Sequence, residues 1–303
     1  MPASALPATL ALLVAAWTTT AVAQHPAVGR YDFQTVSGEG TAIDGTIHTT
    51  LREGRLGGRV ITTVRSPMEI TAVAVDSFVS VRAGGIGFRW PAAAADSFVG
   101  QWRQGNQQGT LRGKRQATEP GNSLRPVPCR APGVGEVVRC ATLFVPEDRA
   151  RPSGRQIPLN LVILPALGEH SEGALWHFAG GPGQASTEGA DGNAERFAAI
   201  RRHRDIVMLD QRGTGGSNGL TCEFRSVEER AAALFGDFFP REVTERCAAA
   251  LAARADLRFY HTAVAALDVD TARAWLGHDR IDLYGGSYGG CAALAYMRAF
   301  PSR

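Results

Sequence analysis

A serine flanked by glycines is the residue in this sequence whose type and spacing point most directly to chemistry. Gly285 and Gly289 lie two positions before and two positions after Ser287, which is the pattern of a nucleophile elbow. At a sharp strand-to-helix turn, side chains at those two positions would collide, so glycine occupies both. An apolar strand pattern precedes Ser287 and a helical pattern follows it. We therefore predict that Ser287 is a nucleophile and that the N–H of Tyr288 lies near a developing oxyanion.

Two further loops could complete such a site. The segment Gly180-Gly181-Pro182-Gly183 follows an apolar run, and successive glycines let backbone N–H groups face an anion without obstruction. A phosphate cradle is the competing interpretation, but the P-loop and dinucleotide-binding patterns are both missing. The third loop runs from Asp210 to Ser217. We expect its charged pair, Asp210 and Arg212, to brace the loop, and Ser217 to be structural because no strand–helix turn surrounds it.

Short apolar runs that alternate with helical patterns must position these loops. Strands are predicted at residues 157–164, 174–178, 205–209 and 281–284, and helices at 194–202, 227–235, 243–255 and 262–276. This alternation predicts an α/β fold with a mostly parallel sheet that is covered on both faces. Ligands of such sheets bind at the carboxyl ends of the strands, which is where all three loops lie.

The loop series Gly-Gly-Pro-Gly, Asp-Gln-Arg-Gly-Thr-Gly-Gly-Ser and Gly-Gly-Ser-Tyr-Gly-Gly resembles the proline iminopeptidase and tripeptidyl-aminopeptidase-like branch of the α/β-hydrolases, over about residues 128–303. The resemblance implies a serine hydrolase that acts without a cofactor on peptide N-termini or related amides and esters. It implies Ser287 as the nucleophile, with Gly181 and Tyr288 as oxyanion donors and Gly180 as the alternative to Gly181. Ala179 departs from relatives in which His directly precedes Gly-Gly.

Two other functions stay open at this point. An esterase or amidase could share the fold, because one fold hosts many substrates. A non-catalytic binding protein or an inactive fragment is the alternative from a different class. A fluorophosphonate probe separates catalysis from binding, since only an activated serine reacts readily.

The N-terminal third differs in kind from the rest. Residues 24–118 contain alternating β-branched runs separated by turn residues, which predicts a small antiparallel sheet or barrel. We interpret this region as a structural appendage, with a binding module as the alternative. Residues 117–128 have the composition of a linker, and residues 119–303 are assigned to the hydrolase domain.

Compartment and partners are indicated by composition. Residues 1–23 carry no charge and end in Ala21-Val22-Ala23, which predicts a signal peptide and a secreted or periplasmic protein. No apolar run is long enough to span a membrane. The 32 basic and 29 acidic residues give a net charge of +3, too even for a nucleic-acid-binding protein. The expected partner is a small peptide or ester substrate.

The five cysteines fit an exported protein. Local spacing favours the pairs Cys129–Cys140 and Cys222–Cys247, although the sequence alone leaves other pairings open. Cys291 falls in an apolar helical pattern, so we expect a buried free thiol there. No Cys or His pair has the spacing of metal ligands, and no metal is expected.

The expected catalytic machinery is incomplete in the 303 residues. In this fold the triad follows the order Ser, then Asp or Glu, then His, yet all seven histidines precede Ser287 and residues 288–303 contain no Asp, Glu or His. We expect the chain to be truncated after the nucleophile helix. The exception would be His177 or His278 reaching Ser287 from an unconventional direction.

A polypeptide that ends at Arg303 should therefore not hydrolyse aminoacyl or acyl esters above background, because nothing removes the proton of Ser287. Release of a chromogenic leaving group measures this. Robust turnover that disappears in Ser287→Ala would show that a base is already present.

Overall fold

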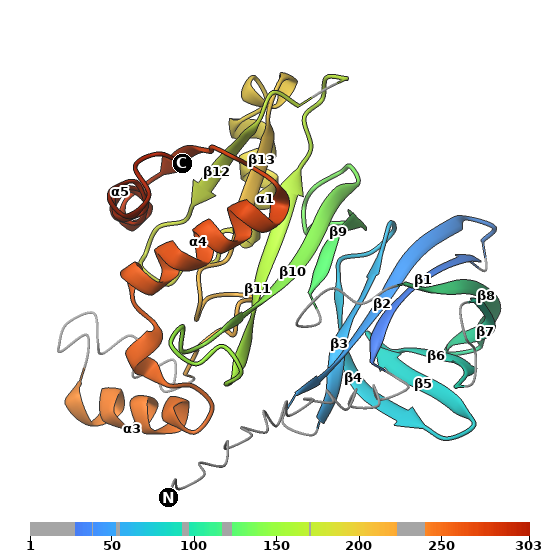
Figure 1. The fold of residues 1–303 in the computed structure, drawn as a ribbon. Coiled ribbons are helices and arrows are strands. Elements are labelled where there is room, and N and C mark those ends of the chain that lie inside the picture. Colours follow the sequence, from blue (N-terminus) through green and yellow to red (C-terminus); the bar gives the residue numbers. More distant parts are fainter. Residues whose placement is uncertain are drawn as a thin grey trace, which may run out of the picture.

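The computed structural model describes residues 28–37, 39–52, 55–92, 97–116, 123–169, 171–222 and 240–303. Within these residues, the chain folds into a closed eight-stranded barrel and a six-stranded sheet with helices, which lie side by side (Figure 1). The predicted signal peptide and the helix predicted at 227–235 lie outside the described residues.

The barrel confirms the expected antiparallel β region. Each strand pairs with its neighbour in sequence, and β1 pairs with β8 to close the barrel. Residues 70–81, which read as one β-branched run, form two strands. Asp76 Oδ1 accepts a hydrogen bond from the N–H of Phe78 at 2.6 Å and turns the chain between them. The strands are β1 (Gly29–Val36), β2 (Ala42–Arg52), β3 (Arg55–Thr62), β4 (Met68–Val75), β5 (Phe78–Ala83), β6 (Ile86–Pro91), β7 (Ser97–Gln104) and β8 (Gln107–Gln116).

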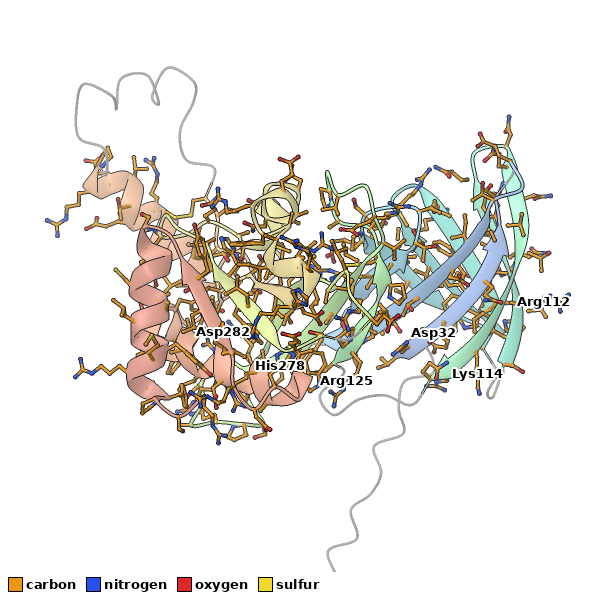
Figure 2. All side chains as sticks on the ribbon, turned by 90° about the horizontal axis from the view of Figure 1, so that it is seen from above. Asp32, Arg112, Lys114, Arg125, His278 and Asp282 are labelled. Carbon is orange, nitrogen blue, oxygen red and sulfur yellow. A yellow bond between two sulfur atoms is a disulfide. The ribbon has the colours of Figure 1, made fainter. Side chains whose placement is uncertain are left out.

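Aromatic side chains fill the interior of the barrel. Trp90 and Phe98 stack with ring centroids 5.5 Å apart, among other buried aromatic residues. Gly113 makes room for them, because a Cβ there would lie 2.3 Å from the ring of Phe98. Figure 2 shows charged side chains such as Asp32, Arg112 and Lys114 on the barrel strands. The buried apolar side chains thus form a packed core inside the barrel.

The second sheet has the strand order β14-β12-β13-β11-β10-β9. Only the half formed by β13, β12 and β14 is parallel, so the prediction of a mostly parallel sheet was wrong. Strands β9, β10 and β11 pair antiparallel because they follow one another through hairpins without helical crossovers. Strand β13 also runs antiparallel to β11. The strands are β9 (Leu124–Cys129), β10 (Val138–Pro146), β11 (Gln156–Leu164), β12 (Ala174–Phe178), β13 (Asp205–Leu209) and β14 (Asp282–Gly285).

The end of the predicted linker is strand β9, which corrects the interpretation of residues 124–128. Leu124, Val127 and Cys129 are buried against β10, while the residues between them are more exposed. Pro126 and Pro128 are tolerated because β9 is the edge strand of the sheet.

Helices cover both faces of the sheet. One face packs against α4 (Thr262–Leu276) and α5 (Tyr288–Ala299). The other face packs against α1 (Ala190–Arg196) and, from the barrel, Ile61. The helix predicted at 194–202 is instead the end of α1 followed by the short 3-10 helix η3 (Ile200–Arg202). The helix predicted at 243–255 is α3 (Arg241–Ala252).

The two favoured disulfide pairings, Cys129–Cys140 and Cys222–Cys247, are confirmed. The expectation for Cys291 was wrong, because the free thiol is exposed. Ala292, Ala293 and Tyr296 point from α5 into the core, whereas Cys291 lies on the opposite face of the helix. An apolar helical pattern alone does not say which of its faces is covered.

We predict that replacing both Cys129 and Cys140 by alanine lowers the free energy of unfolding by about 2–4 kcal/mol, since the cross-link restricts the unfolded chain. Urea denaturation under oxidising conditions measures the change. Cys291→Ser is the matched control and should leave the midpoint unaltered. Equal midpoints for the double variant and the parent protein would contradict the prediction.

Candidate active site

Ser287 lies on a strained turn between β14 and α5. Its φ is 52° and its ψ is −127°, a conformation that side chains other than glycine rarely adopt. Ser287 is the residue that precedes the first turn of α5, and it is exposed. The turn therefore presents the hydroxyl at the carboxyl end of β14, as the sequence predicts.

The two flanking glycines are required by close backbone contacts. A Cβ on Gly285 would lie 2.2 Å from the carbonyl oxygen of Gly289. A Cβ on Gly289 would lie 2.1 Å from the carbonyl oxygen of Phe178, at the end of the neighbouring strand β12. The contact between Gly289 and Phe178 matters more for the site, because it places the beginning of α5 directly against the loop that follows β12.

The glycine loop after β12 borders Ser287. A Cβ on Gly180 would lie 3.4 Å from the Cβ of Ser287, so the two backbones are in close proximity. Gly181 has a φ of +104°, which favours glycine at this position. Gly180, Gly181 and Ser287 line one cavity of about 450 Å³. The structure thus brings the predicted nucleophile and the predicted donor loop together, and Tyr288 is the residue next to Ser287.

His177 also lines this cavity. Its Nδ1 lies 2.8 Å from Ser186 Oγ and 3.3 Å from Asn193 Nδ2, and its ring stacks on Tyr284. Burial lowers the pKa of His177, and the nearby Arg196 guanidinium lowers it further, so the ring is neutral at pH 7. The Nδ1 atom of His177 thus interacts with Ser186 and Asn193 in the wall of the cavity.

His278 lies at the other end of β14. It precedes the strand, whereas Ser287 follows it, and its Nδ1 accepts a hydrogen bond from Trp176 Nε1 at 3.4 Å. In the described part of the chain, no imidazole or carboxylate is hydrogen-bonded to Ser287, and His278 does not line its cavity.

The Asp210–Ser217 loop braces the site, but its two charged residues do not pair with each other. The carboxylate of Asp210 is fully buried and accepts from the N–H of Thr187 at 2.9 Å and that of Gly216 at 3.0 Å. It also accepts from Thr187 Oγ1 and from Asn160 Nδ2. Asp210 thus ties its own loop to the segment that follows the glycine loop.

Arg212 pairs with Asp268 of α4, a partner that sequence analysis did not predict. Nε donates to Oδ2 at 2.6 Å and Nη2 to Oδ1 at 2.8 Å, and Arg149 contacts the same carboxylate. Arg212 Nη1 also donates to the carbonyl oxygens of Glu147 and Phe259. The guanidinium thereby links the loop, α4 and the end of β10 in a buried network.

Ser217 is not accessible to a substrate. Its side chain is fully buried, and its Oγ accepts a hydrogen bond from the N–H of Asn160 at 2.8 Å. Asn160, at the centre of β11, is another functional residue that sequence analysis missed. Its only signal in the sequence is that it is a polar residue inside an apolar strand.

Neither a metal centre nor a membrane span is evident in the described residues. There, no group of three or more His, Cys, Asp or Glu side chains could hold a metal ion. In the same part of the chain, no helix has the length and apolarity needed to cross a membrane.

Comparison with known proteins shows which proteins this chain resembles. Residues 161–303 match the alpha/beta hydrolase fold family. The serine protease Hip1 of Mycobacterium tuberculosis is 29% identical over 210 residues, which cover 63% of this chain and 40% of Hip1. The resemblance to α/β-hydrolases of the tripeptidyl-aminopeptidase kind is thus confirmed, and residues 161–303 carry the match to the alpha/beta hydrolase fold.

Two more relatives share parts of the chain. The tripeptidyl aminopeptidase of Streptomyces lividans is 29% identical over 180 residues, which cover 54% of this chain and 33% of that protein. Carboxylesterase B of Mycobacterium tuberculosis is 40% identical over 87 residues, which cover 28% of this chain and 16% of that protein. The chain thus spans at most 40% of the length of these relatives.

We predict that Gly289→Ala lowers the free energy of unfolding by about 3 kcal/mol or more, because its Cβ would meet the carbonyl oxygen of Phe178. Gly286→Ala is the matched control: a Cβ there has no neighbour within 4 Å, so its effect should stay within about 1 kcal/mol. Urea denaturation of both variants measures the difference. Similar losses in the two variants would contradict the proposed contact.

Proposed function

We propose that this protein is a serine hydrolase that cleaves peptide N-termini or related amides and esters, with Ser287 as the nucleophile. The observation that supports it most directly is the turn at Ser287, where a positive φ exposes the hydroxyl beside Gly180. The relatedness to a serine protease and to a tripeptidyl aminopeptidase agrees with this chemistry.

In the proposed reaction, Ser287 Oγ attacks the substrate carbonyl carbon while a base takes its proton. The carbonyl oxygen becomes an oxyanion that accepts hydrogen bonds from the N–H groups of Gly181 and Tyr288. Collapse of the tetrahedral intermediate expels the amine or alcohol, and water then releases the acyl group from Ser287. The close approach of the Gly180–Gly183 loop to Ser287 supports this assignment of donors.

The reaction also needs an imidazole and a carboxylate that orients it. We assign both to a further segment that would cover the outer edge of β14 and the exposed face of α5. Two features support this assignment. Strand β14 is at the edge of the sheet, and Leu294 and Met297 of α5 expose 67% and 54% of their surface.

A carboxylic ester is the second candidate substrate. It is favoured by the similarity of 87 residues to a carboxylesterase, and the oxyanion site does not distinguish an ester from an amide. Comparing aminoacyl anilides with short-chain acyl esters separates the two, because an aminopeptidase requires the free α-amino group and an esterase does not.

We further propose that the protein is secreted or periplasmic. The support is the pair of disulfides, one of which, Cys129–Cys140, is buried and closes an 11-residue separation. Disulfides persist in oxidising compartments and are rare in the reducing cytosol.

We predict that Ser287→Ala abolishes covalent labelling of the native gene product by a fluorophosphonate probe, because the attacking hydroxyl is lost. Gel fluorescence and mass spectrometry of the labelled peptide measure it. Ser217→Ala is the control and should keep most of the labelling, since that hydroxyl is buried against Asn160. Absence of labelling in the parent protein, or undiminished labelling of Ser287→Ala, would overturn the assignment.

A further inference from the structure

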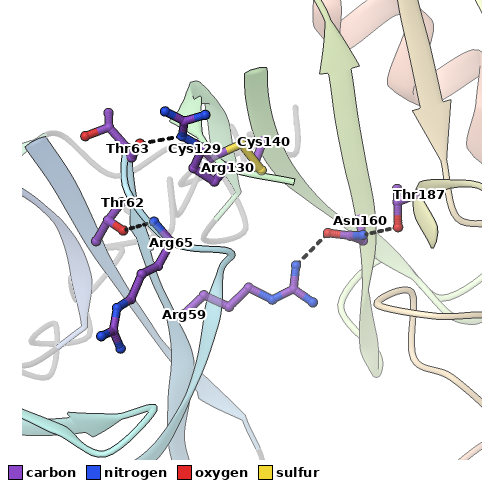
Figure 3. The surroundings of a disulfide bond; sticks show 9 residues. All are labelled: Arg59, Thr62, Thr63, Arg65, Cys129, Arg130, Cys140, Asn160 and Thr187. Atoms are coloured by element: carbon purple, nitrogen blue, oxygen red, sulfur yellow. Dashed lines mark hydrogen bonds between the residues drawn. A yellow bond between two sulfur atoms is a disulfide. The ribbon is translucent and has the colours of Figure 1, made fainter. Parts of the chain in front are cut away.

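One side chain of the barrel reaches into the hydrolase sheet. Arg59 of β3 donates from Nη1 to Asn160 Oδ1 of β11 at 2.6 Å, and its Nε lies 2.5 Å from Glu69 Oε1 of β4. Only 19% of the Arg59 side chain is exposed. Figure 3 shows Arg59 crossing the space between the two sheets toward Asn160. Gly216 makes room for it, because a Cβ there would lie 2.7 Å from Arg59 Nη2.

The bond from Arg59 determines how the Asn160 amide is oriented. An Arg side chain only donates, so the amide oxygen of Asn160 must face it. The amide nitrogen then points the other way and donates to Asp210 Oδ2 at 2.9 Å and to Thr187 Oγ1 at 3.2 Å. The reversed amide would place an oxygen against the buried carboxylate of Asp210, which is repulsive.

Asp210 connects the Asn160 amide to the wall of the candidate active site. Its carboxylate accepts from the N–H of Thr187, the first residue of the 3-10 helix η2 (Thr187–Gly189). Ser186, the residue before it, lines the Ser287 cavity and donates to the carbonyl oxygen of His177 at 2.8 Å. The segment held in this way is the direct continuation of the Gly180–Gly183 loop.

We propose that Arg59 is a positioning residue of the hydrolase site: it fixes the Asn160 amide and, through Asp210, the segment that carries the oxyanion loop. The barrel is then part of the active-site scaffold and not an appendage. The effect on the reaction rests on the proposed function, whereas the effect on the geometry does not. Oxyanion donors require such fixed backbone, because small displacements weaken them.

The chain offers a matched control for this proposal. Arg130 also bridges the barrel and the second sheet, since its Nε donates to the carbonyl oxygen of Thr63 at 2.9 Å and its Nη1 to that of Gly135 at 2.5 Å. It does not contact Asn160 or Asp210. Removal of Arg130 therefore weakens the contact between the two parts and leaves the route to the site intact.

The experiment is amide hydrogen exchange by NMR on the 303-residue chain. In Arg59→Ala, we expect the amides of Thr187 and Gly216 to exchange about tenfold faster, because the Asp210 carboxylate loses its fixed partner. The amide of Ala166, which donates to Asp205 Oδ1 at 2.8 Å, should stay unchanged. Arg59→Lys should restore part of the protection, since its ammonium can still donate to Asn160.

Two results would overturn the proposal. One is unchanged exchange of Thr187 and Gly216 in Arg59→Ala, and the other is an equal acceleration in Arg130→Ala, which would mean that only docking of the barrel matters.

Fluorophosphonate labelling of the native gene product provides the second readout. It should slow about tenfold in Arg59→Ala and not in Arg130→Ala, because the oxyanion donor is displaced and not removed, whereas complete removal of a donor costs about 10²–10³ in rate. Labelling at the parental rate in Arg59→Ala would refute the effect on the reaction. Failure of the parent protein to react would refute the proposed function, and the exchange rates would still decide the positioning role.

Discussion

At the end of β12, the carbonyl oxygen of Phe178 lies 2.1 Å from the point where a side chain on Gly289 would begin. Helix α5 can approach the strand this closely only because Gly289 has no side chain. The approach puts Ser287, two residues earlier, against Gly180. The proximity of Ser287 to the glycine loop is thus a consequence of the backbone packing of Gly289 against Phe178. Because Gly289 is buried there, little adjustment is possible.

That packing requires β12 to be held firmly, and the strand order does this. Strand β12 lies between β13 and β14, although both follow it in sequence. After β12 the chain forms β13 on one side of that strand, and it later forms β14 on the other side. The connections therefore diverge at the carboxyl end of β12. Trp176 and Leu175 bury opposite faces of the strand in the two cores of the sheet. A site at this end therefore has a rigid base.

Sequence analysis located the local features of the site and missed those that depend on distant partners. The glycine spacing around Ser287 reflects a local steric requirement, so the turn was predictable, and β12 and β13 have their predicted bounds. The direction of the strands could not be predicted, because an apolar run has the same composition in a parallel or an antiparallel sheet. Arg212 finds its partner Asp268 on a helix far along the chain, and no spacing rule connects them. The same holds for Arg59 and Asn160.

The two buried carboxylates of the site are stabilised by different means, and the difference explains how the parts are joined. Asp268 is paired with the guanidinium groups of Arg212 and Arg149, so its charge is compensated directly. Asp210 has only uncharged donors, which must all point inward to offset the loss of hydration. One of those donors, the Asn160 amide, depends on Arg59 for its orientation. The burial of Asp210 thus links a barrel side chain to the loop beside Ser287, and Ile61 in the core of the sheet anchors the same strand.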